Sequence, residues 1–145
     1  MDFIIIFADC NRKAETNGTE TNGTEKTFIQ IQNQDVYLNI VGGFKLDEPA
    51  GDLSVALAVY SGYFDIPISE KLIAFGEIGL GGEVRNTSNI SQRITEAERL
   101  GFSECIIPKH SLRNIDPNRY NMHIYGVSSL KQAFSVIRKS MEETT

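Results

Sequence analysis

The chain has 145 residues, of which 41% are hydrophobic and 23% are charged, and its formal net charge is −5. This length suits a single domain that buries about two-thirds of its unfolded surface, and the composition is that of an ordinary soluble protein. The acidic total argues against a protein that binds polyanions over its whole surface.

The charge is unevenly distributed along the chain. Residues 85–139 contain nine Lys and Arg against four Asp and Glu, whereas residues 1–84 contain five basic and thirteen acidic residues. Such segregation is typical of a surface that faces a polyanion. Basic helix faces that are simply solvated give the same pattern, so both interpretations stay open.

The N-terminal stretch MDFIIIFADC has an apolar run of about six residues and no basic flank, so it has the form of neither a membrane span nor a signal peptide. It predicts a strand or a disordered start. Cys10 and Cys105 have no His or Cys at metal-ligand spacing, which argues against a zinc site and a disulfide framework. We expect a cytoplasmic protein without membrane contact.

Residues 11–27, NRKAETNGTETNGTEKT, contain TNGTE twice in tandem. The segment is polar and has no hydrophobic period, which predicts a linker, a hairpin tip or disorder. We therefore expect a divergent N-terminal segment over residues 1–27, one domain over residues 28–140 and a tail over residues 141–145.

Two strands and a helix are predicted next. TFIQIQ (residues 27–32) and DVYLNIVGG (residues 35–43) are typical strands. A helix is expected from Pro49 to Phe64, because Pro suits a first helical turn and the acidic residues around it complement the helix dipole. Its apolar stripe comprises Leu53, Ala56, Leu57 and Tyr60.

The glycine-rich KLIAFGEIGLGGEV (residues 71–84) predicts two short strands around a turn. A second helix is expected over residues 89–100, with Asn89 and Gln92 as a capping box and Gly101 as its stop. Strands are then predicted at SECIIPK (residues 103–109) and MHIYGV (residues 122–127), and a last helix begins at Ser129. The expected architecture is mixed α/β, with three helices on a small sheet.

Few motifs for catalysis or ligand binding are present. The chain has no G-x-x-x-x-G-K-[ST], so it contains no P-loop ATPase, and GEIGLGG is followed by strand-like residues, which favours a turn over a dinucleotide site. His110 and His123 are far apart, and we favour structural or surface roles for them. Ser54 has no identifiable base nearby and is interpreted as a packing residue.

Residues 47–52, DEPAGD, lead the chain into the first predicted helix. A helix N-terminus offers free N–H groups and a positive dipole end that stabilise a developing oxyanion, so it suits a nucleophile. The position where a hydroxyl or thiol would serve holds Ala50. The turn therefore has the layout of a catalytic site without a nucleophile.

Five stretches resemble, in this order, the C-terminal domain of the bacterial RadA (Sms) DNA repair family, which is itself similar to the proteolytic domain of Lon. They are DVYLNIVGGFKLDEPAGDLSVALAV, FGEIGLGGEVR, QRITEAERLGF, IIPK and GVSSLKQAF. The resemblance implies a Lon proteolytic-domain-like fold, also called ribosomal protein S5 domain 2-like. The zinc ribbon and the RecA-like ATPase that precede this domain in the family have no match here, so no zinc, ATP or magnesium is expected in this chain.

Lon proteases carry a Ser–Lys dyad, with the serine in G-P-S-A-G and the lysine on the helix after a G-E-[IV]-x-L-x-G-x-V segment. The resemblance puts Ala50 at the serine position and Arg93 at the lysine position. Alanine has no group to attack a carbonyl, and arginine stays protonated at any working pH and cannot act as a base. RadA shows the same kind of vacancy, so we expect no enzymatic activity.

The resemblance also implies a hexameric ring that provides a scaffold and a DNA-binding surface for an ATP-driven motor of branch migration. The expected partners are single-stranded or branched DNA, further copies of the chain, and a RecA-like ATPase domain or recombinase. Arg85 and Lys109 are candidate DNA contacts because both follow predicted strand ends in matching stretches, and Arg93 is a third candidate. Alternatively, Arg85 and Lys109 cap turns and Arg93 pairs with a carboxylate such as Glu77 or Glu96.

Two other functions stay open. One is an interaction or oligomerisation module without DNA contact, and a less favoured one is an active Lon-type peptidase with a relocated nucleophile. The chain itself is a truncated RadA, an isolated domain or a free-standing relative that works with a separate ATPase.

Overall fold

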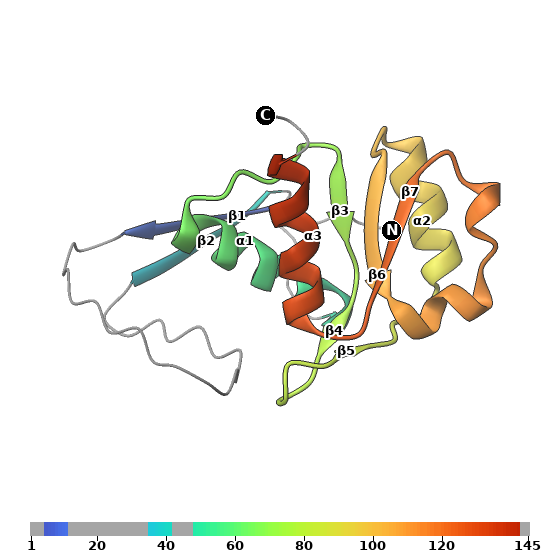
Figure 1. Ribbon diagram of the computed structural model, residues 1–145, viewed down its shortest axis with the longest axis horizontal. Helices are drawn as coiled ribbons and strands as arrows, with labels where there is room; N and C mark the ends of the chain where they lie inside the picture. The colour runs from blue at the N-terminus through green and yellow to red at the C-terminus, as the bar shows by residue number, and fades with distance from the viewer. Residues whose placement is uncertain (1–4, 12–34, 42–47, 143–145) are drawn as a thin grey trace.

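The computed structural model describes residues 5–11, 35–41 and 48–142 (Figure 1). The predicted strand at residues 27–32 and the TNGTE repeat lie outside these ranges. Within them the chain is mixed α/β with three main helices, as the sequence predicts.

A three-stranded parallel sheet forms the centre of the domain. It consists of β3 (Leu72–Ala74), β6 (Glu104–Pro108) and β7 (His123–Val127), in the order β3-β6-β7. Parallel strands need a crossover connection, and α2 (Ile90–Arg99) lies in the segment between β3 and β6. Residues 103–109 and 122–127 therefore contain strands, as predicted.

Successive residues of the sheet belong to two hydrophobic cores. In β6, Ile106 packs into the core shared with α1 (Asp52–Phe64) and α3 (Leu130–Glu142), whereas Cys105 and Ile107 pack into the core shared with α2. Figure 1 shows α1 and α3 on one side of the sheet and α2 on the other. This layering follows from the two-residue period of a strand.

The predicted apolar stripe of α1 is buried, with one exception. Ala56 is only half-buried, and Ala58 is buried instead. The rings of Tyr60 and Phe134 stack with their centroids 3.9 Å apart, which joins α1 to α3. The buried helical residues are Leu53, Leu57, Ala58, Tyr60, Ile90, Ile94, Ala97, Ala133, Phe134 and Ile137.

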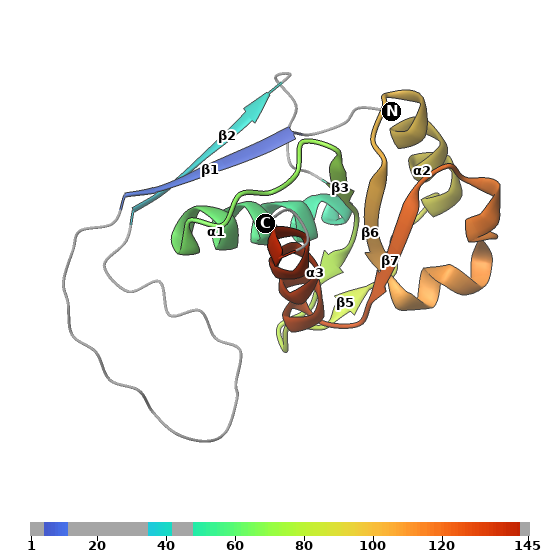
Figure 2. The ribbon, with the colours of Figure 1, turned by 45° about the horizontal axis from the view of Figure 1, so that its top comes forward.

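The first apolar run of the sequence is a strand. β1 (Ile5–Asn11) pairs antiparallel with β2 (Asp35–Val41), from the pair Ile5–Val41 to the pair Asn11–Asp35. β1 contacts α1, and Figure 2 shows the hairpin running along that helix. The hairpin thus connects the N-terminal segment, residues 1–27, to the rest of the fold.

For residues 71–84 the sequence predicts two short strands, but the structure has three, the last of which ends at Arg85. β3 joins the parallel sheet, while β4 (Glu77–Ile78) and β5 (Val84–Arg85) form a separate antiparallel hairpin. Two- and three-residue strands are too short to show a hydrophobic period, so the sequence pattern could not separate them. Gly82, with φ of +80°, provides the left-handed turn residue between β4 and β5.

The predicted capping box of α2 is wrong, although the helix begins at Ile90 beside the predicted position. Asn89 has φ of +57° instead of an extended conformation and makes no side-chain cap, so Asn89 and Gln92 do not form a capping box. The predicted stop is confirmed, since Gly101 follows α2 with φ of +93°. The start of α3 is also confirmed, because Ser129 Oγ accepts a hydrogen bond from the N–H of Gln132 at 3.3 Å.

In the described part of the chain, no helix has both the length and the apolar character needed to cross a membrane.

Candidate functional site

Ala50 lies in a short 3₁₀ turn, Pro49–Gly51, immediately before α1. It is buried, with 4% of its surface exposed. Its carbonyl accepts a hydrogen bond from the N–H of Gly76 at 3.0 Å, and the carbonyl of Gly76 accepts one from the N–H of Leu53 at 3.0 Å. The turn and the start of α1 are therefore held to the segment between β3 and β4 by two backbone hydrogen bonds.

Gly76 allows this close approach because it has no side chain. A Cβ at this position would lie 2.8 Å from Val84 Cγ1 and 3.2 Å from Leu53 Cδ2. Asp52 adds a third connection, since its Oδ2 accepts a hydrogen bond from the N–H of Ile78 in β4 at 3.2 Å. These contacts fix the turn of Ala50 against the segment between β3 and β4 and against β4.

Arg93 lies on α2 and is buried, with 6% of its surface exposed. Its Nε donates to the carbonyl of Ser88 at 3.0 Å, and its Nη2 forms an ion pair with Glu48 Oε1. Its guanidinium carbon lies 5.8 Å from the centre of the Phe75 ring. Burial lowers the pKa of Arg93 because desolvation disfavours the charged form, while the Glu48 carboxylate is the countercharge that the pair supplies.

The sequence predicts Arg93 either on a DNA-facing surface or paired with a carboxylate such as Glu77 or Glu96, and in the structure its partner is the carboxylate of Glu48. The two are 45 positions apart, so no local spacing signals the pair. Glu96 pairs with Arg99 one helical turn away.

Ser54 has a structural role. Its hydroxyl donates to the carbonyl of Ala74 in β3 at 2.7 Å, which fastens α1 to the central sheet. This agrees with the interpretation of Ser54 as a packing residue.

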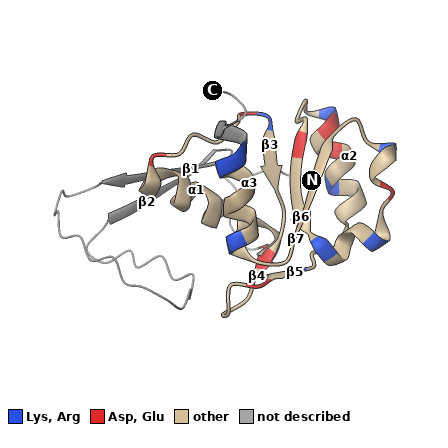
Figure 3. Cartoon of the chain, in the orientation of Figure 1, with Lys and Arg blue, Asp and Glu red and all other residues tan. Residues whose placement is uncertain are grey.

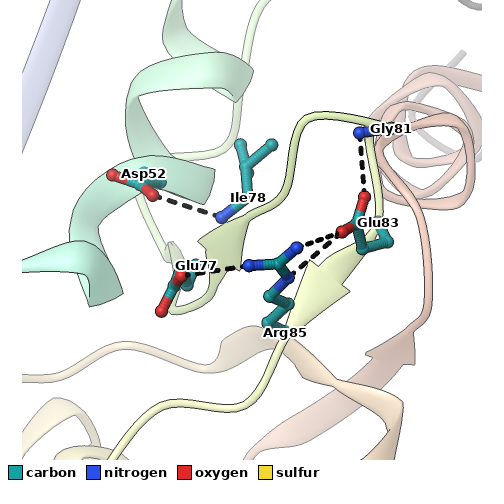
Figure 4. A network of polar contacts seen from close by, with 6 residues as sticks. All are labelled: Asp52, Glu77, Ile78, Gly81, Glu83 and Arg85. Atoms are coloured by element: carbon teal, nitrogen blue, oxygen red, sulfur yellow. Dashed lines mark hydrogen bonds and ion pairs between the residues drawn. The ribbon is translucent and has the colours of Figure 1, made fainter.

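Arg85 lies in a network of carboxylates around the β4–β5 hairpin (Figure 4). Its Nε and Nη2 donate to Glu83 Oε1 at 3.1 and 2.6 Å, and its Nη1 lies 3.7 Å from Glu77 Oε1. The pKa of Glu83 is lowered, first by its own backbone N–H and then by Arg85, and the pKa of Arg85 is raised by Glu83. The charge of Arg85 is thus balanced within its own hairpin. This agrees with the alternative prediction, in which Arg85 caps a turn.

Lys109 is exposed at the start of the 3₁₀ segment Lys109–Asn114, which follows β6. It forms no ion pair with any residue that the structure describes. His110 and His123 are also exposed, and the His123 ring packs 4.3 Å from that of Tyr125. Of the three candidate DNA contacts, Lys109 alone presents an exposed charge without a carboxylate partner among the described residues.

The described residues hold no group of three or more His, Cys, Asp or Glu side chains that could bind a metal ion. At the two positions that the resemblance to Lon proteases assigns to a catalytic dyad, the structure has the methyl group of Ala50 and the ion-paired guanidinium of Arg93.

Comparison with known proteins agrees with this geometry. The family model described as subunit ChlI of Mg-chelatase matches residues 21–111. The chain is 45% identical over 109 residues to the DNA repair protein RadA of Streptococcus pyogenes serotype M3, which covers 75% of this chain and 24% of that protein. Over 135 residues it is 38% identical to the RadA of Streptococcus pneumoniae, covering 88% of this chain and 32% of the relative. The chain is 40% identical to the RadA of Escherichia coli over 108 residues, which cover 74% of this chain and 23% of the relative. The chain thus spans a quarter to a third of the length of these relatives.

Proposed function

The chain belongs to the ChlI family of Lon-protease-like domains and is homologous to part of RadA, and from this premise we propose that it is a non-proteolytic scaffold domain that self-associates and binds DNA for a RecA-like ATPase. The ATPase is supplied from outside the 145 residues, either by a longer chain or by a separate protein. The motor activity of branch migration belongs to that ATPase, and this domain holds the motor on DNA.

The ion pair between Arg93 and Glu48, beside the turn of Ala50, is the observation that supports a domain without proteolytic activity. A lysine base must lose its proton, and desolvation helps a lysine to do so. An arginine beside a carboxylate keeps its charge, so the same position serves to bind α2 to the turn. The fold of a protease is retained as a rigid frame.

Self-association is supported by the tip of the β4–β5 hairpin. Leu80 is fully exposed there, with a relative accessibility of 103%, and Glu83 stabilises the turn by accepting from the N–H of Gly81 at 3.0 Å. Figure 4 shows how the Glu83 carboxylate connects this turn to Arg85. A rigid turn that presents a large apolar side chain to water suits a contact with another subunit.

DNA binding is supported by the excess of basic residues in residues 85–139 and by the RadA relatives, which are DNA repair proteins. The test is an electrophoretic mobility shift of the 145-residue protein with single-stranded and forked DNA across a salt series. We expect weak, sequence-independent and steeply salt-dependent binding. Absence of binding at 50 mM salt would favour the second candidate, an interaction module without DNA contact.

A further inference from the structure

Two groups of basic residues in the described part of the chain differ in their partners. Arg85, Arg93 and Arg99 each form an ion pair with a carboxylate. The side chains of Lys109, Arg113 and Arg119 are exposed and form no hydrogen bond or ion pair with any described residue. A polyanion competes with an existing carboxylate for the first group, but for the second group it competes only with water.

We infer that residues 109–119, here called the basic loop, form the surface that holds DNA phosphates, and that Arg85 and Arg93 do not take part. This inference rests on the proposed function and specifies where DNA binds. The loop connects β6 to β7 and contains the 3₁₀ segments Lys109–Asn114 and Pro117–Arg119. It is the orange segment beside β7 in Figure 1, and Figure 3 shows several blue positions along it.

Buried and half-buried side chains attach the basic loop to the rest of the fold. Ser111 is buried, with 2% of its surface exposed, and its hydroxyl donates to Asn86 Oδ1 at 3.2 Å. Leu112 and Ile115 pack against the core that α2 shares with the sheet. A loop fixed in this way loses little conformational entropy when it binds, which favours binding by a small number of charged groups.

The same anchoring directs the charges outward. A 3₁₀ helix has three residues per turn, so His110 and Arg113 lie one above the other on one edge of the first segment. Both are exposed, as is Lys109, while Ser111 between them is buried. The periodicity of the segment thus places His110 and Arg113 together on the solvent side.

The single carboxylate of the basic loop does not cancel this charge. Asp116 accepts a hydrogen bond from the N–H of Asn118 at 3.1 Å, and thereby begins the 3₁₀ turn that carries Arg119. The loop has three permanent cations against this one carboxylate, and a neighbouring His110. It therefore presents net positive charge, in contrast to the β4–β5 hairpin, where Glu77 and Glu83 outnumber Arg85.

The chemistry of the loop suits phosphate more than bases. Guanidinium groups bind phosphate oxygens bidentately, and a lysine adds a point charge. The loop contains no Phe, Tyr or Trp, and Tyr120, which follows it, packs against the α2 core. We therefore expect binding to the sugar–phosphate backbone, with no preference for base sequence.

The test measures DNA affinity by fluorescence anisotropy for the full chain and for R113A, R119A and the double variant R113A/R119A, with labelled oligo(dT) and labelled forked duplex between 50 and 200 mM salt. Each lost phosphate contact is expected to lower the slope of log K against log salt by about 0.7 for the single strand and about 0.9 for the duplex. The matched controls are R85A, whose charge is already balanced, and K139A, an exposed lysine on α3. Neither control is expected to change the slope.

The outcomes separate the two proposals. If the wild-type protein binds DNA and R85A or K139A weakens binding as much as R113A/R119A does, the basic loop is not the DNA surface, although the domain still binds DNA. If the double variant binds as the wild type does, the same conclusion holds. If the wild-type protein binds neither DNA, the proposed function itself is wrong. Because Arg113 and Arg119 are exposed and make no contact with described side chains, we expect the thermal unfolding of the variants to match the wild type.

Discussion

Arg93 of α2 forms an ion pair with Glu48, the residue that immediately precedes the turn of Ala50. The pair joins two segments that lie 45 positions apart in the sequence. The guanidinium is buried while the Glu48 side chain stays 55% exposed. The pair therefore holds α2 and the segment before the turn together through a fixed charge.

The first prediction concerns the contribution of this pair to stability. Glu48→Gln removes the countercharge and leaves the Arg93 guanidinium buried without a carboxylate, which is costly in a poorly solvated site. Because Glu48 is half-exposed and water can replace part of the interaction, we expect a loss of about 1–2 kcal/mol in the free energy of unfolding. Urea unfolding followed by circular dichroism measures this.

The control for this prediction is Glu70→Gln, which changes the same group at an exposed position without an ion pair among the described residues. It should leave the unfolding free energy within about 0.5 kcal/mol of the wild type. Arg93→Lys should lie between the two, since lysine keeps the charge but cannot bind Ser88 and Glu48 with a planar fork. Equal stabilities for E48Q and E70Q would show that the pair contributes nothing.

The second prediction is that the protein does not cleave peptides, and that restoring the dyad residues does not create a protease. The double variant A50S/R93K supplies a hydroxyl and an amine, but the lysine would still face the Glu48 carboxylate, which keeps it protonated. The oxyanion donors also need accurate support from their neighbours. A fluorogenic peptide assay tests both proteins, and turnover by the repurified wild type would contradict the whole interpretation of the site.

Much of the fold could be predicted from the sequence because its long elements have clear periods. The apolar faces of α2 and α3 follow a helical repeat, and the stop at Gly101 depends on a local backbone property. The strands β4 and β5 have two residues each, which is too short for any pattern. The predicted capping box at Asn89 is wrong because the residue has a left-handed backbone, which asparagine adopts more readily than most residues.

The candidate site was only partly predictable. Ala50 and Arg93 were located through a motif, which fixes positions along the chain, but a motif carries no information on which side chains meet in space. Glu48 as the partner of Arg93, and Glu83 as the main partner of Arg85, emerge only when the turn, α2 and the β4–β5 hairpin are folded together. Arg113 forms no ion pair with any described carboxylate, and no spacing in the sequence reveals this.

The third prediction concerns Cys105, which is fully buried in β6. Burial raises the pKa of its thiol from 9.0 to about 12, because the thiolate is disfavoured away from water. In a Cys10→Ser background, we therefore expect the native protein to react with a thiol reagent at pH 8 far more slowly than the protein unfolded in urea. Equal rates would mean that this part of the core opens readily.

The same shift gives a pH dependence of stability. The folded-state pKa is raised, so the contribution of the protonated thiol is complete below the unfolded-state pKa and is lost as the pH rises from about 9 towards about 12. Cys105→Ala should weaken this alkaline loss relative to the Cys10→Ser parent, as measured by urea unfolding between pH 8 and pH 10.5. An unchanged pH profile would assign the alkaline loss to other groups.

The fourth prediction concerns self-association. We expect a concentration-dependent oligomer that reaches a hexamer at the limit, with contacts too small to hold fully at micromolar concentration in the absence of an ATPase ring. Leu80→Ser should weaken this association because it removes the exposed side chain at the hairpin tip, whereas Leu100→Ser, at another exposed leucine, should not. Sedimentation velocity gives the answer, and a strict monomer at millimolar concentration would remove self-association from the proposal.

The last prediction connects packing to DNA binding through Gly126 of β7. A Cβ at this position would lie 2.4 Å from Leu112 Cδ1 and 3.3 Å from the Cα of Lys109, so the basic loop rests on the bare backbone of the strand. Gly126→Ala must push Leu112 aside and is expected to cost about 1–2 kcal/mol of stability. Because Leu112 anchors the loop that carries Arg113, the same change should weaken DNA binding.

The control for this last prediction is a double-mutant cycle with Leu112→Ala, which removes the atom that clashes. If the two residues are coupled as the packing indicates, the double variant L112A/G126A should lose less stability than the sum of the two single losses, by about 0.5–1 kcal/mol. Strict additivity in urea unfolding would show that Leu112 does not rest on Gly126. If the packing of Leu112 positions the phosphate contacts, a change in that packing must change DNA affinity. A G126A protein that is destabilised but binds DNA with unchanged affinity would therefore show that this packing is unimportant for binding.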